Sequence, residues 1–199
     1  KLFVEREMGM LRNLFALIGL LAVIGAAALY AKFNSALDGF DPGAGDVFKE
    51  FGQALVESKS AAEASIWKVQ VEEGLSADDV EETMKFVANE HNMSNVGELP
   101  LSLDIEAKSG SDYRFVKIYL FCNSLIAAEM LDYSDAYSAY LPCRITLIED
   151  KQGKLWLMTL NMDMMIYGGE PLPPALKEKA IQVKEYILDI MNRGAAGDF

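Results

Sequence analysis

The residues of this chain best suited to chemistry include its two cysteines. Cys122 and Cys143 are the only two among 199 residues, and each borders an apolar run. Outside the cytoplasm a nearby pair of thiols is usually oxidised, and closing a loop of about 20 residues would stabilise the fold by roughly 3 kcal/mol. The two could equally be separate small buried thiols, a redox pair or ligands. We expect both to be largely buried and near each other, whether or not they are bonded.

Soft-metal binding is a second candidate chemistry. His91 and Met93 are two residues apart, and so are Met162 and Met164 in the segment NMDMM. Thioether and imidazole ligands suit Cu(I), and alternate residues of a strand share one face. Methionine is also an ordinary filler of irregular cores, and the chain has ten. We therefore predict no cofactor, and keep copper at these four residues as the alternative.

The common catalytic constellations are missing from the sequence. His91 is the only histidine, which excludes every site that needs two imidazoles. We expect it to cap carbonyls at a helix end or to pack against the sheet. The sequence has no nucleophile elbow, phosphate-binding glycine loop, dinucleotide fingerprint or haem-attachment motif. These absences favour a protein that is not an enzyme, and an enzyme of unknown class is the remaining alternative.

An uncharged apolar segment near the N-terminus predicts a membrane anchor. Residues 14–31, LFALIGLLAVIGAAALYA, would span roughly 27 Å as a helix, close to the thickness of a bilayer core. A cleaved signal peptide is the competing interpretation, since Ala26–Ala28 satisfy a small-x-small cleavage rule. Ala22 and Ala26 also form a small-xxx-small pair, which allows another transmembrane helix to pack closely.

The charges around this segment predict its orientation. Lys1, Arg6 and Arg12 precede it and only Lys32 follows closely. The positive-inside rule then predicts a cytoplasmic N-terminus and an exported C-terminal domain, in the inner membrane of a bacterium. The formal net charge of the chain is −12, which repels phosphate backbones and argues against nucleic acid as a partner. The same charge would attract a basic protein such as a small cytochrome.

The rest of the chain divides into a linker and one domain. We predict a tail and transmembrane helix in residues 1–33, a linker with a juxtamembrane amphipathic helix in residues 34–65, and an α+β domain in residues 66–199. The linker begins with Gly, Pro and Asp, and its apolar residues then recur at helical spacing.

Alternation and helical periodicity predict the elements of the domain. Ser76 and Asp79 stand at capping-box spacing, and Gly194 is expected just past the last helix. We predict strands within residues 66–74, 95–100, 114–123, 143–150 and 154–162, a hairpin turn at 150–153, and helices within residues 76–92, 124–132 and 173–194. Residues 101–110 alternate like a strand, but Pro100 and Gly110 bracket them like a short helix, which we favour. The fold class is thus α+β: one transmembrane helix, then a small domain with a mostly antiparallel sheet covered by helices.

Two separated elements of the domain resemble a known family. One strand ends in Cys122-Asn123, a small-residue helix follows, and Leu141-Pro142-Cys143-Arg144 opens the next strand. This order and spacing resemble the core of domain-of-unknown-function family 302, although Ser124 stands where that family usually has proline. The likeness covers roughly residues 66–193. It implies a small α+β fold, often paired as dimers, with no established catalytic activity.

The resemblance and the composition together lead to one functional expectation. The motif residues Cys122, Asn123, Pro142, Cys143 and Arg144 are candidates for binding or for a disulfide. We expect a membrane-anchored, exported binding module, a non-catalytic accessory subunit of a respiratory or electron-transfer type complex. Its partners would be other membrane subunits, with a homodimer as a further option. The alternative is a periplasmic copper-binding or thiol-redox module.

Overall fold

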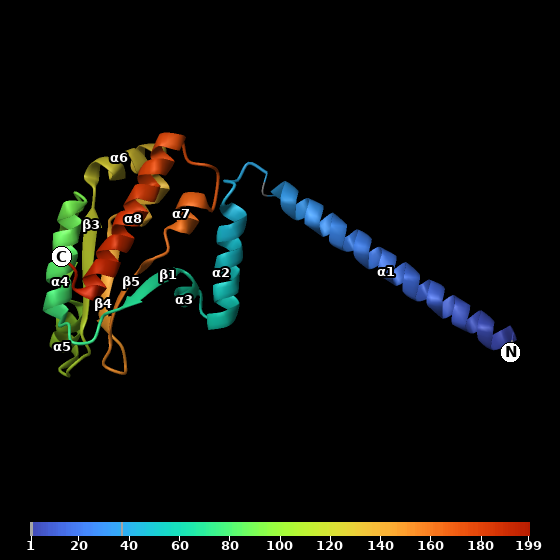
Figure 1. The fold of residues 1–199 in the computed structure, drawn as a ribbon, viewed down its shortest axis with the longest axis horizontal. Coiled ribbons are helices and arrows are strands. Elements are labelled where there is room, and N and C mark those ends of the chain that lie inside the picture. The colour runs from blue at the N-terminus through green and yellow to red at the C-terminus, as the bar shows by residue number, and fades with distance from the viewer. Residues whose placement is uncertain (1, 37) are drawn as a thin grey trace. The chain divides into compact units, whose positions relative to one another are not determined.

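The computed structural model describes residues 2–36 and 38–199 of the chain (Figure 1). It divides into two compact units, residues 1–40 and 41–199. The first unit is built on one helix, α1 (Leu2–Ala36). The part of α1 from Arg12 to Ala36 is long and apolar enough to cross a membrane. It contains the predicted span and both alanines of the small-residue pair.

The second unit is built on a five-stranded antiparallel sheet. Its strands have the order β1-β5-β4-β3-β2, and every neighbouring pair is antiparallel. The strands are β1 (Ile66–Gln70), β2 (Ser94–Leu99), β3 (Val116–Cys122), β4 (Cys143–Glu149) and β5 (Leu155–Leu160). This confirms the predicted fold class. The hairpin between β4 and β5 is tied by the carboxylate of Asp150, which accepts hydrogen bonds from the backbone of Gln152 and Lys154 and from the Trp156 indole.

Helices precede, connect and follow the strands. They are α2 (Ala44–Ser58), α3 (Ala61–Ala64), α4 (Ala77–Glu90), α5 (Leu101–Ser109), α6 (Ser124–Tyr133), the 3₁₀ helix η1 (Asp135–Ala139), α7 (Asp163–Tyr167) and α8 (Pro174–Ala196). The capping box of Ser76 and Asp79 is formed at the start of α4, as predicted. The predicted end of α8 is wrong. The helix continues through Gly194 to Ala196. Gly197 is its C-cap, and its φ of 67° is the left-handed conformation typical of a helix stop.

The hydrophobic core lies between one face of the sheet and the helices α4 and α8 (Figure 1). Alternate residues of the central strands point to this face and are fully buried, namely Tyr119, Phe121, Ile145, Leu147 and Leu157. Val87 of α4 and Ile187 of α8 meet them from the helical layer. The intervening residues, such as Ile118 and Met158, are partly exposed on the other face. This alternation is the sheet period of two that the sequence displays.

An ion-pair cluster fixes α4 to the edge of the sheet. The Lys117 ammonium lies 2.7 Å from carboxylate oxygens of both Glu81 and Glu98, and Lys85 lies 2.6 Å from Glu98. The hydroxyl of Tyr119 donates to Glu81 at 2.6 Å. Burial and this hydrogen bond raise the pKa of Tyr119. The cluster therefore joins α4, β2 and β3 by charge as well as by packing.

The segment before α2 is attached to α8. The buried carboxylate of Asp41 accepts a hydrogen bond from the Gly43 backbone at 2.9 Å and forms an ion pair with Lys177. Val47 is buried on the inner side of α2, while Val56 is 76% exposed. The amphipathic helix predicted within residues 34–65 is present as α2, and it belongs to the same compact unit as the sheet.

Candidate functional site

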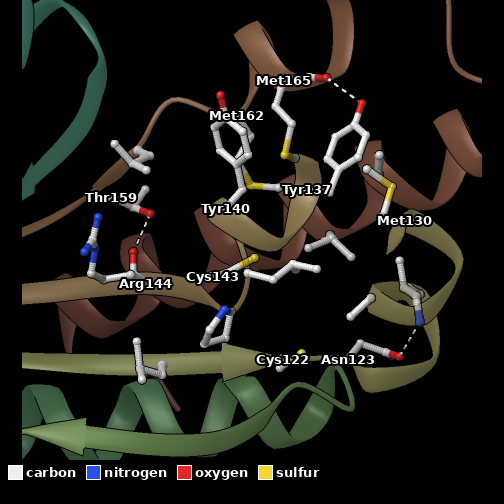
Figure 2. Close-up of a pocket in the computed structure, with 18 of the residues that line it drawn as sticks. Cys122, Asn123, Met130, Tyr137, Tyr140, Cys143, Arg144, Thr159, Met162 and Met165 are labelled. Carbon is white, nitrogen blue, oxygen red and sulfur yellow. Dashed lines mark hydrogen bonds between the residues drawn. The ribbon is translucent and has the colours of Figure 1, made fainter. Parts of the chain in front are cut away.

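A cavity of about 190 Å³ opens at the end of the sheet where β3 and β5 finish and β4 begins (Figure 2). We call it the sulfur-lined cavity, because six sulfur-containing side chains line it: Cys122, Cys143, Met93, Met130, Met162 and Met165. The other lining residues are mostly aliphatic or aromatic, and Arg144 is the only charged residue among them.

Strand pairing brings the two halves of the cysteine motif together in this cavity. Phe121 pairs with Cys143 across β3 and β4, so Cys122 lies one position further along the neighbouring strand. The expected proximity of the two cysteines is therefore confirmed. Both are free thiols, and both are partly exposed rather than largely buried as expected. They border a cavity instead of filling the core, which explains the difference.

Both thiols are harder to ionise than an ordinary cysteine. Burial raises the pKa of Cys143 to about 11, and the neighbouring Cys122 adds to the rise. Burial also raises the pKa of Cys122, which a hydrogen bond with Ser124 partly offsets. At neutral pH each is a neutral thiol, and thiols in this form are weak nucleophiles.

The α6 helix forms one wall of the cavity. Its N-cap is Asn123, whose side-chain oxygen accepts a hydrogen bond from the Ile126 backbone at 3.3 Å. Ser124 occupies the first helical position, where a missing N–H costs nothing, so proline is suited to it and serine is tolerated. This wall contributes Ile126, Ala127 and Met130 to the lining. The motif residue Asn123 thus positions the wall by starting the helix.

The segment around η1 covers another side of the cavity. Tyr137 and Tyr140 both line it, and the Tyr137 hydroxyl donates to the Met165 carbonyl oxygen at 3.4 Å (Figure 2). Burial raises the pKa of Tyr137, so its phenol stays protonated as a donor. This bond ties the covering segment to α7.

The predicted pairing of Met162 with Met164 is wrong. The strand β5 ends at Leu160, and the Asn161 side chain then accepts a hydrogen bond from the Asp163 backbone at 2.8 Å as α7 begins. Residues three apart share the face of a helical turn, so Met162 and Met165 line the cavity and Met164 does not. The prediction assumed the two-residue repeat of a strand for Met162 and Met164, but the chain changes from strand to helix before these residues.

The predicted ligand pair of His91 and Met93 is also separated. His91 is the C-cap of α4, so it does end the helix, but it faces α8 rather than the sheet. Its Nε2 lies 2.7 Å from an Asp189 carboxylate oxygen, and its ring stacks on Tyr186 at 4.2 Å between centroids. Only Met93 reaches the sulfur-lined cavity.

The remaining motif residues lie at the rim of the cavity. The Leu141–Pro142 peptide bond is cis, and both residues line the opening. The side chain of Arg144 is exposed, while its backbone carbonyl accepts a hydrogen bond from Thr159 at 2.6 Å. That bond holds the start of β4 to the end of β5.

Comparison with known proteins identifies the domain. Residues 67–194 match the family described as "Domain of unknown function DUF302", and they make up more than half of the chain. This chain belongs to the DUF302 family. It is also similar to a solved structure, that of an uncharacterised conserved DUF302 protein from Bacillus stearothermophilus, with 17% sequence identity and a TM-score of 0.53. The similarity covers 64% of this chain and 96% of that chain, and it concerns the fold. No curated protein matches.

The DUF302 domain thus assembles its sulfur-lined cavity from residues that the sequence only partly predicts. The motif predicts Cys122, Asn123, Pro142, Cys143 and Arg144, and all five line it. Met130, Met165, Tyr137 and Tyr140 were missed. For Met165 a signal existed, since Asn161 and Asp163 favour a helix start and place Met165 one turn after Met162.

The chemistry available in the cavity is soft and apolar. In the part of the chain whose side chains are described, no three or more His, Cys, Asp and Glu residues are grouped to hold a metal ion. The lining offers thiol and thioether sulfur, aromatic rings and one guanidinium at the rim. Such a lining suits a small apolar molecule or a soft monovalent metal ion.

Proposed function

We propose that this chain is a membrane-tethered binding protein whose DUF302 domain holds a small ligand in the sulfur-lined cavity and catalyses no reaction. One observation carries the proposal. The two halves of the motif, Cys122-Asn123 and residues 141–144, are separated by a helix and a covering segment, yet both line the same cavity. If the motif served only to specify the fold, its two separated halves would not need to line the same cavity.

The composition of the lining supports binding rather than catalysis. General acid–base catalysis needs a group with a pKa near neutral pH, most often histidine or a carboxylate. The lining residues include neither, and the two thiols have raised pKa values. A cavity of about 190 Å³ is large enough for a ligand, since apolar cavities of about 150 Å³ bind benzene.

The apolar helix and the charges that precede it support the proposed tether. Arg12 stands at the start of the long apolar part of α1, and Lys1 and Arg6 lie before it. The positive-inside rule supports an N-terminus in the cytoplasm and a DUF302 domain exported to the periplasm of a bacterium. This arrangement would keep the binding domain next to the membrane as one part of a larger assembly.

The proposed assembly is an inner-membrane complex of the respiratory or electron-transfer type, with this chain as an accessory subunit. The formal charge of −12 supports a basic soluble partner such as a cytochrome, because opposite charge accelerates encounter. The small-residue pair Ala22 and Ala26 supports contact with another transmembrane helix.

Native mass spectrometry of the full chain, purified from its own membrane in mild detergent, tests the binding function. The wild-type chain should carry one bound small species. Ala127→Leu adds side-chain volume inside the cavity and should reduce its occupancy at least tenfold. Ala128→Leu is the matched control, because Ala128 is the next residue of α6 and is exposed.

Two outcomes contradict the binding function. One is a wild-type chain that carries no bound species when it is isolated gently. The other is an Ala127→Leu chain that retains the species as the wild type does. Near-ultraviolet circular dichroism of both variants checks that each keeps its tertiary packing.

A further inference from the structure

We propose that the ligand of the sulfur-lined cavity is Cu(I), held by Cys143, Met162 and Met165. This inference rests on the proposed binding function and names the class of ligand. It differs from the pattern predicted in the sequence, because His91 and Met164 lie outside the cavity and Met165 and Cys143 lie within it.

The positions of the sulfur donors support this assignment. Met162 and Met165 are one turn apart at the start of α7, and the Met165 backbone donates to the Met162 carbonyl at 3.0 Å. Figure 2 shows both sulfurs directed into the cavity, above the sulfur of Cys143 at the start of β4. Three sulfur donors from two elements thus line the same space.

The chemical identity of the donors also favours Cu(I). Thiolate and thioether sulfur are soft ligands that select Cu(I), whereas Mg²⁺ and Ca²⁺ require oxygen and Zn²⁺ takes cysteine, histidine or carboxylate. The lining residues contain no histidine and no carboxylate. The donor set therefore favours a soft monovalent ion over the common divalent ions.

The charges of the ligands also balance that of a monovalent ion. When Cu(I) binds, the Cys143 thiol loses its proton to solvent, a copper–sulfur bond forms, and no oxidation state changes. One thiolate neutralises one Cu(I), and the two thioethers add no charge. A neutral unit costs far less to hold in an apolar cavity than an unpaired ion does. A divalent ion with the same three ligands would leave one buried positive charge.

The neighbouring groups pack around the proposed ligands and hold the covering segment in place. The phenol of Tyr137 is bonded to the backbone of Met165, so the covering segment is anchored beside a proposed ligand. Met130 and Met93 extend the apolar lining behind it and are almost fully buried.

The test is anaerobic titration of the full chain in detergent with Cu(I), in competition with the chromophoric chelator bicinchoninate. The wild type should bind one Cu(I) per chain. Met162→Leu and Met165→Leu keep the volume of the side chain and should each weaken binding at least tenfold. Met164→Leu is the matched control on the same helix, and it should bind as the wild type does.

Copper X-ray absorption of the loaded chain gives an independent measurement. It should show sulfur neighbours and no nitrogen or oxygen neighbours. Cys143→Ser should lose stoichiometric binding, and the Met162→Leu, Met165→Leu double variant provides the same test if the serine variant does not fold.

Two results overturn the copper assignment. One is a wild-type chain that takes no Cu(I) from bicinchoninate at equal concentration. The other is a double methionine variant with wild-type affinity. Failure here is distinguishable from failure of the binding function, because native mass spectrometry would then find an organic species that Ala127→Leu removes and copper does not replace.

Discussion

Glu98 is the carboxylate of the domain whose pKa is lowered most strongly by its neighbours. Its oxygens lie 2.7 Å from Lys117 and 2.6 Å from Lys85. Hydrogen bonds from Lys117 first, and then from Lys85, lower the pKa of Glu98 to about 2. The pKa of Glu81, in the same cluster, is also lowered, because hydrogen bonds from Lys117, Lys85 and Tyr119 outweigh the opposing effect of burial.

The first prediction is a loss of stability in acid that depends on Glu98. A carboxylate with a lowered pKa stabilises the folded state above its unfolded pKa, and this contribution disappears as the pH falls toward the folded value. Its window is therefore about pH 4.5 down to about 2. The side chain is 29% exposed, so solvent screening limits the effect to about 1–2 kcal/mol.

The measurement is the free energy of unfolding of the full chain against pH, for wild type and Glu98→Gln. The glutamine variant keeps the shape of the side chain and should lose this part of the acid dependence. Identical pH profiles for the two proteins would show that the ion pairs of Glu98 add nothing to stability.

Single residues also show where the sequence was informative. The capping box of Ser76 and Asp79 lies within four consecutive residues, so it could be predicted, and it is formed. The choice of Met164 over Met165 depended on where a strand changes to a helix. That boundary is set by the Asn161 side chain, which bonds the backbone of Asp163.

At the scale of elements, α4 and α8 pack so closely that one position has no room for a side chain. A Cβ at Gly194 would lie 2.6 Å from Cγ of Met84 and 3.4 Å from Leu157. Gly194 is buried within α8, where alanine would otherwise favour the helix. Close packing of the two helices therefore requires glycine at this position.

The second prediction is that Gly194→Ala destabilises the domain by about 1–3 kcal/mol, because the added methyl group overpacks the contact between the helices. Gly52→Ala is the matched control, because Gly52 lies in α2 with open space around it. The control should raise stability by about 0.5–1 kcal/mol through helix propensity. Thermal unfolding of the full chain measures both, and equal changes of the same sign would contradict the packing argument.

The sequence predicted the elements better than it predicted the cavity. Period-two alternation identified β3, β4 and β5, and helical periodicity identified α4 and α8, because both patterns are local. The five-residue helix α7 was not predicted, because its mostly apolar residues follow directly on those of β5. The cavity draws on seven separate elements, namely β3, α6, η1, β4, β5, α7 and α8. Residues such as Tyr137 and Met130 therefore join it only after the chain has folded.

At the scale of the whole molecule, the third prediction concerns topology. Residues 14–31 should cross the membrane once, with Arg12 inside and residues 41–199 outside. A protease added to intact spheroplasts should digest the DUF302 domain, and the same protease should leave a cytoplasmic marker protein intact. Full protection of the domain would reverse the proposed orientation.

The fourth prediction concerns assembly. In mild detergent the chain should migrate as part of a species larger than its own 22.0 kDa and the micelle. Ala22→Leu with Ala26→Leu should weaken this association, because bulky side chains keep transmembrane helices apart. Migration as a monomer in every mild detergent would remove the support for a complex and leave α1 as a simple tether.

The proposals for this domain depend on the sulfur-lined cavity being an occupied binding site. Crystallographic difference density from the natively purified chain tests it most directly. The expected result is density inside the cavity in contact with Cys143, Met162 and Met165, with an anomalous signal at the copper edge if the ligand is Cu(I). A cavity that is empty or filled by its own tyrosine side chains, in crystals of the natively purified chain, would contradict the claim.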